Sequence, residues 1–146
     1  MGVVKRGRHK GRGIGGLTTK VHVVVDGLGN PLRFLLSPGT RNDIVYAQEL
    51  LEPFDLSGKK VLADMGYDQE RFCEHIREQG GQVMIPSRVT NRIQRELDAD
   101  EYRERHLVEN LFQKLKNRRR FATRYEKLDS SFAAVVTLAF ILIWLF

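Results

Sequence analysis

The sequence predicts a single α/β domain, on three observations. Two β-branched runs flank turn residues at 26–30, a short apolar run ends at Asp64, and an amphipathic helical pattern covers residues 101–120. The chain has 146 residues, 42% of them apolar, which is enough to bury one core but hardly two. We therefore expect one folded unit over residues 17–146, preceded by a flexible basic arm over residues 1–16.

Charge and cysteine content restrict the partners more than the chemistry. The 24 Lys and Arg residues exceed the 18 Asp and Glu residues, and much of the excess lies at positions 5–12 and 114–120. Such clusters attract polyanions, nucleic acid first and anionic membrane second. The single cysteine, Cys73, excludes an internal disulfide and leaves the compartment open, with a reducing cytoplasm as the default.

The first elements follow from turn chemistry. Residues 1–16 are rich in Gly, Arg and Lys and have no hydrophobic period, which predicts the flexible arm. Residues 17–26 and 31–36 are short apolar strands joined by Asp-Gly-Leu-Gly-Asn, and this pattern predicts a hairpin. We interpret Asp26 as a turn residue and not as a metal ligand.

The middle of the chain alternates helical and strand patterns. We expect helices at residues 44–52 and 69–79, strands at 61–63 and 82–86, and a polar loop at 87–100. The strand at 61–63 places Asp64 at its carboxyl end, where ligands and catalytic groups gather in α/β sheets. The alternative is that Asp64 is only a loop or helix-start residue.

Four side chains form a column on the helix predicted at 101–120. At about 100° per residue, Tyr102, Arg105, Glu109 and Lys116 fall within an arc of roughly 60°, beside the apolar stripe. The simplest interpretation is an ordinary i,i+4 ion pair between Arg105 and Glu109, contributing about 0.2–0.5 kcal/mol.

Residues 132–146 are almost wholly apolar. At about 1.5 Å per residue they cover roughly 22 Å, less than the about 30 Å of a bilayer's hydrocarbon core. A buried core helix is therefore favoured over a membrane span.

The carboxylates Asp64 and Glu109 suggest a chemistry if they meet. Their mutual repulsion can be offset by a divalent cation that takes them as oxygen ligands. Two such ions can activate a water or a 3′ hydroxyl and stabilise the leaving oxygen in phosphodiester cleavage. Cations one helical turn away would hold the phosphate backbone.

Several motifs resemble one family. The spacing Tyr102-x2-Arg105-x3-Glu109-x6-Lys116 matches the Tyr-Arg-Glu-Lys signature of DDE-class transposases of bacterial insertion sequences, in the groups numbered four and five. Asp-Met-Gly-Tyr at 64–67 resembles their second-aspartate motif. The segments GGLTTKVHVVVDGLGNPL and RRRFATRYEKLDSSF are also similar to the group numbered five.

The resemblance implies a ribonuclease-H-like fold, a mixed sheet flanked by helices in which strands 1 to 3 are antiparallel. Asp64 would be the second catalytic aspartate and Glu109 the glutamate, both ligands of two Mg²⁺ (or Mn²⁺) ions. The implied DNA contacts are Tyr102, Arg105, Lys116, Arg119 and Arg120. The partners would be double-stranded DNA at transposon ends and target, and the reaction hydrolysis followed by attack of the freed 3′ hydroxyl. A homo-oligomer in the bacterial cytoplasm, associated with the nucleoid, is implied as well.

The sequence departs from the family in one respect. No acidic residue precedes Asp26, so the family's first aspartate has no counterpart. We interpret the chain as the C-terminal part of a transposase that lacks the first strand and has little or no activity alone. It would associate with another copy or with a chain from the upstream reading frame. Two alternatives stay open: a catalytically silent DNA-binding fragment that joins a full-length transposase through its apolar C-terminal helix, and a small basic membrane-associated protein.

Overall fold

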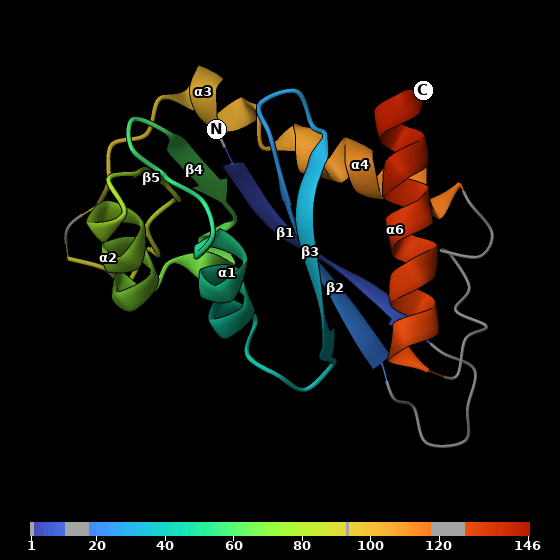
Figure 1. Ribbon diagram of the computed structural model, residues 1–146. Helices are drawn as coiled ribbons and strands as arrows, with labels where there is room; N and C mark the ends of the chain where they lie inside the picture. The colour runs from blue at the N-terminus through green and yellow to red at the C-terminus, as the bar shows by residue number, and fades with distance from the viewer. Residues whose placement is uncertain (1, 11–17, 93, 118–127) are drawn as a thin grey trace.

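One mixed sheet organises the molecule. The computed structural model describes residues 2–10, 18–92, 94–117 and 128–146. Five strands lie in the order β3-β2-β1-β4-β5, with helices on both faces (Figure 1). The predicted mixed α/β class is confirmed. The strands are β1 (Gly2–Lys10), β2 (Thr18–Val25), β3 (Pro31–Pro38), β4 (Lys60–Ala63) and β5 (Gln82–Met84).

The pairing of the strands determines which strand ends lie at the same edge of the sheet. β2 and β3 pair antiparallel, as the predicted hairpin requires, and β1 also pairs antiparallel with β2. β4 runs parallel to both β1 and β5. Val4 of β1 lies opposite Ala63, and Leu62 of β4 lies opposite Met84. Because parallel strands point the same way, the carboxyl ends of β1, β4 and β5 all point toward the same edge of the sheet.

The β2–β3 turn matches its prediction. The Asp26 carboxylate accepts hydrogen bonds from the backbone N–H groups of Leu28 and Asn30, both at 2.8 Å. Gly29 has φ 87°, a left-handed conformation that glycine adopts without steric cost. Asp26 is therefore a turn residue, with its carboxylate committed to the hairpin.

The first ten residues differ from the expected arm. Gly2–Lys10 form β1, which pairs with β2 on one side and β4 on the other. A strand therefore precedes the hairpin, although we expected the first strand to be missing. The prediction was wrong because it used the side-chain pattern alone, whereas a central strand is also held by backbone hydrogen bonds to two neighbours. Residues 11–17 lie outside the described part of the chain.

Two apolar clusters lie on opposite faces of the sheet. Val21, Val23 and Val25 pack with one set of helices, and Val24 packs with the other set. The first face is covered by α4 (His106–Lys116) and α6 (Asp129–Leu145), and the second by α1 (Asp43–Leu51) and α2 (Glu70–Glu78). This alternation along β2 is what a sheet buried on both faces requires.

The C-terminal helix is only half buried, which corrects the predicted core helix over residues 132–146. Phe132 and Phe140 of α6 face the sheet, and the Trp144 indole donates to the Pro31 carbonyl at 2.9 Å. The opposite face is exposed and apolar, with Leu138, Ile141, Leu142 and Leu145. Among the described residues, no helix is both long and apolar enough to cross a membrane.

We expect Phe132→Ala to lower the free energy of unfolding by about 3–5 kcal/mol, because it leaves a cavity between α6 and the sheet. Urea unfolding followed by circular dichroism measures this loss. Phe146→Ala is the matched control, since the Phe146 side chain is 98% exposed and should change little. Equal effects of the two substitutions would contradict the placement of α6.

Candidate active site

Asp64 directly follows β4, a strand whose last three residues are buried. The three residues before it, Val61, Leu62 and Ala63, are fully buried, so the position of the strand end is tightly constrained. Asp64 then precedes a short 3₁₀ helix, η1 (Met65–Tyr67). Its own side chain is 43% exposed, so the carboxylate lies at the surface end of a rigid strand.

The helix predicted over residues 101–120 is broken. The structure has α3 (Ala99–Arg103), a turn at 104–105 and then α4. Around the break the backbone bonds run to the third preceding residue, from Arg105 N to Tyr102 O and from Leu107 N to Glu104 O. The His106 ring also contacts a carbonyl of the preceding turn, with Nδ1 2.8 Å from the Arg103 oxygen. These tighter bonds replace the α-helical ladder and end α3.

Arg105 brings the two candidate carboxylates together. Its Nη1 lies 2.6 Å from Asp64 Oδ1 and 2.9 Å from Glu109 Oε1. The i,i+4 ion pair between Arg105 and Glu109, our simplest interpretation, is therefore present. Arg105 also binds a second acid, Asp64, which follows the distant strand β4. The Arg105 side chain is 25% exposed and that of Glu109 39%, so the cluster is partly shielded from water.

Tyr102 packs beside this cluster. Its hydroxyl donates a long hydrogen bond, 3.5 Å, to the Ala63 carbonyl, and the Arg105 guanidinium lies 5.8 Å from its ring centroid. Burial raises the pKa of Tyr102 above its ordinary value, and the nearby carboxylates raise it further while Arg105 lowers it. Burial alone would lower the pKa of Arg105, but the negative charges of Asp64 and Glu109 raise it. The phenol therefore stays neutral and the guanidinium charged at neutral pH.

The remaining predicted residues do not join the cluster. Lys116 is exposed in the last turn of α4, about 10 Å along the helix axis from Glu109. Arg119 and Arg120 lie outside the described residues. The structure thus brings together Asp64, Tyr102, Arg105 and Glu109.

The cluster fits one hard cation better than two. Mg²⁺ is commonly bound by one or two carboxylates, completed by water and substrate phosphates, and Asp64 and Glu109 supply that number. In the described part of the chain no group of three or more His, Cys, Asp and Glu residues could hold a metal ion. A cationic group, the Arg105 guanidinium, already bridges the two carboxylates. A second ion would need at least one further ligand.

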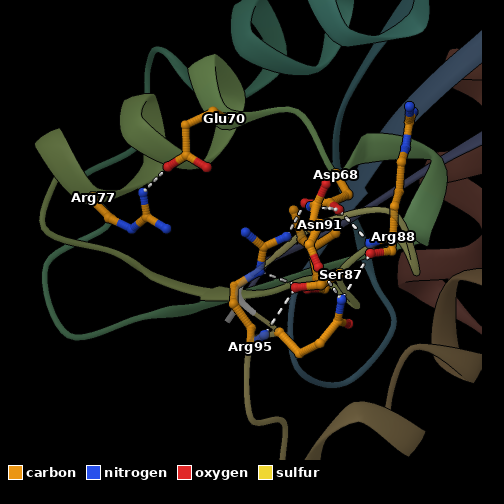
Figure 2. Close-up of polar contacts among 9 residues, drawn as sticks. Asp68, Glu70, Arg77, Ser87, Arg88, Asn91 and Arg95 are labelled. Atoms are coloured by element: carbon orange, nitrogen blue, oxygen red, sulfur yellow. Dashed lines mark hydrogen bonds and ion pairs between the residues drawn. The ribbon is translucent and has the colours of Figure 1, made fainter.

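Sequence reasoning missed a second polar cluster, built around Asp68 (Figure 2). The Asp68 carboxylate accepts the backbone N–H of Arg88 at 2.6 Å and the side-chain amide of Asn91 at 2.8 Å, and it pairs with Arg95. Burial opposes ionisation, but the hydrogen bonds from the Arg88 backbone and the Arg95 side chain, with the charges of Arg95 and Arg88, hold the pKa of Asp68 below its ordinary value. No sequence period links Asp68 to its partners, so only tertiary structure reveals them.

Comparison with known proteins gives a family. A family model described as "Transposase DDE domain" matches residues 3–144. The chain is also 38% identical over 130 residues to a protein of Brucella ovis described as "Putative transposase for insertion sequence element IS6501". That alignment covers 88% of this chain and 99% of the Brucella protein.

We expect a double-mutant cycle of Asp64→Asn and Arg105→Gln to give a coupling energy of about 0.5–1 kcal/mol, because the pair is only partly exposed. The control cycle uses Asp100→Asn and Arg103→Gln, whose side chains are 87% and 78% exposed, and should show no measurable coupling. Urea unfolding of the four proteins in each cycle provides the energies. Zero coupling in the first cycle would remove Arg105 as a link between β4 and α4.

The lowered pKa of Asp68 predicts that the free energy of unfolding falls at acid pH, a decline termed the acid limb below. A carboxyl whose folded pKa lies below its unfolded value of about 3.8 stabilises the fold fully above that value. The contribution is lost as the pH falls through the folded pKa. Asp68→Asn should therefore lower stability at pH 7 by about 1–3 kcal/mol and flatten the decline below pH about 4.

Urea midpoints between pH 7 and pH 2.5 test this expectation. Asn91→Ala is the control, since it removes one neutral hydrogen bond and keeps the Asp68 carboxylate. This variant should have a lower free energy of unfolding at neutral pH, but it should keep most of the loss of stability that wild type shows on acidification. An acid limb of wild-type steepness in Asp68→Asn would assign that limb to other groups.

Proposed function

Because this chain belongs to the DDE-class transposases of insertion sequences, we propose that it takes part in DNA transposition with Asp64 and Glu109 as catalytic carboxylates. The observation that carries the proposal is the meeting of these two acids at one guanidinium nitrogen of Arg105. They come from a strand end and a later helix, so their meeting is a property of the fold and not of local sequence. Tyr102 and Arg105 lie beside them, at the positions of the family signature.

The sheet supports a ribonuclease-H-like fold. Three antiparallel strands continue into two parallel ones in the order β3-β2-β1-β4-β5, with helices on both faces. The carboxyl end of β4 then holds Asp64, as the resemblance implies for the second aspartate. We infer this fold from the order and directions of the strands together with the family.

The chain's own residues would perform three tasks. Asp64 and Glu109 would hold a divalent cation, Mg²⁺ or Mn²⁺, which when bound supplies Lewis-acid activation for phosphodiester hydrolysis and strand transfer. Arg105 would keep the carboxylates close before the cation binds, and it could then turn to a DNA phosphate with its remaining donors. Lys116, Arg119 and Arg120 would follow the phosphate backbone along and beyond α4.

The acidic set limits the activity we propose for the chain alone. The first acid in the sequence, Asp26, commits its carboxylate to the hairpin turn. Asp64 and Glu109 are therefore joined by no third carboxylate among the described residues. We infer that cleavage requires a ligand from a second, different chain, such as the product of the upstream reading frame.

The same observation favours a second candidate function. A two-carboxylate cluster that already contains a guanidinium would suit a catalytically silent, DNA-binding member of a transposase assembly. In that case Asp64→Asn would leave both DNA affinity and biological effect unchanged. The two candidates therefore differ in their dependence on the carboxylates.

The test is cleavage of DNA carrying the element's ends, with Mg²⁺ or Mn²⁺, by this chain alone and mixed with the upstream product. We expect no cleavage by the chain alone and cleavage in the mixture, reduced to background by Asp64→Asn or Glu109→Gln. Glu104→Gln is a matched control, because Glu104 is an exposed acid next to Arg105 and should leave cleavage unchanged. Silence of the mixture with DNA binding retained would favour the second candidate, whereas cleavage surviving both substitutions would remove these carboxylates from catalysis.

A further inference from the structure

We propose that residues 87–92, termed the basic loop, form a DNA-backbone contact in which Arg88 and Arg92 bind phosphates next to Asp64. The proposal rests on the proposed function in DNA transposition and adds residues that the family signature does not include. The ligand is the phosphodiester backbone of duplex DNA. Four observations support it: the position of the loop, its rigidity, its free positive charge, and the negative charge of the groove between α1 and α2.

The sheet places the basic loop beside the candidate active site. β4 and β5 are parallel neighbours, with Leu62 opposite Met84. Asp64 follows β4, and the basic loop begins three residues after β5 ends. The two segments therefore follow the carboxyl ends of adjacent strands, at the same edge of the sheet. DNA whose backbone reaches Asp64 passes over this edge of the sheet.

Asp68 holds the basic loop rigidly. Its side chain is 2% exposed and accepts hydrogen bonds from the loop at both Arg88 N–H and Asn91 Nδ2. Gln94 adds bonds to the carbonyls of Arg88 and Asn91, at 3.0 and 2.8 Å. A loop ordered in the free protein loses less conformational entropy when it binds, so its contacts contribute more to affinity.

The loop's positive charge is left for a partner. Arg95 forms the ion pair with Asp68, whereas Arg88 contributes only backbone hydrogen bonds to the cluster, and its side chain extends away from the other sticks (Figure 2). Arg88 and Arg92 are both exposed, and the described residues contain no salt bridge to either. Exposed guanidinium groups bind phosphate oxygens through paired N–H donors.

The surface formed by α1 and α2 carries the opposite charge. A groove between these helices is lined by Glu49, Glu52, Glu74 and Glu78, together with Gln48, Arg71 and His75. This surface repels polyanions, whereas the basic loop attracts them. The charge distribution therefore orients bound DNA toward the basic loop and Asp64.

The experiment measures how salt affects the binding of a fluorescein-labelled duplex of about 20 base pairs, by anisotropy. Each lost phosphate contact should reduce the slope of log K against log salt by about 0.9 and weaken binding about five- to tenfold at 0.1 M salt. We expect this change for Arg88→Gln and for Arg92→Gln, and about twice the slope change for the double variant. Arg88→Lys should retain the slope, because it keeps the charge.

Arg71→Gln and Arg77→Gln are matched controls on α2. Arg71 lines the acidic groove and Arg77 pairs with Glu70, so both variants should bind like wild type. If Arg88→Gln, Arg92→Gln and the double variant all keep the wild-type slope while wild type binds DNA, the basic loop is not the contact, although the proposed function stands. If wild type shows no salt-dependent DNA binding, the proposed function fails, and this inference fails with it.

Discussion

The burial of β4 on both faces is the constraint on which the candidate active site depends. Leu62 packs into the cluster under α4 and α6, while Val61 and Ala63 pack into the cluster under α1 and α2. A strand held from both sides has little freedom to shift, because a slip of one residue would exchange its buried faces. Asp64 lies at the end of this strand, where Tyr102 contacts Ala63 and Arg105 contacts Asp64.

The polar clusters at the end of β4 are organised by the same means. In each, an arginine from a later segment meets an acid near the strand end: Arg105 meets Asp64, and Arg95 meets Asp68. The two acids directly flank η1, Asp64 before it and Asp68 after it. The partly exposed cluster keeps acids available for chemistry, whereas the buried one fixes the chain between β5 and α3. Exposure thus separates a candidate catalytic role from a structural one.

The sequence predicted those parts of the molecule that local patterns determine. The hairpin follows from its Asp-Gly and Gly-Asn turn residues, and β4 from its apolar run. The spacing of Tyr102, Arg105 and Glu109 correctly indicated one side of a helical segment, even though the helix breaks at residue 104. Three features could not be predicted, because each depends on partners distant in the chain: β1, the contact of Arg105 with Asp64, and the cluster of Asp68.

The docking of α6 on the hairpin has an optical consequence. Trp144 is the only tryptophan in the chain, and its indole donates to the Pro31 carbonyl at the start of β3. An indole that loses such a partner and gains water changes its emission. The emission of Trp144, which is 55% exposed in the native chain, therefore reports the docking of α6 on the start of β3, and it can follow the detachment of that helix separately from the melting of the sheet.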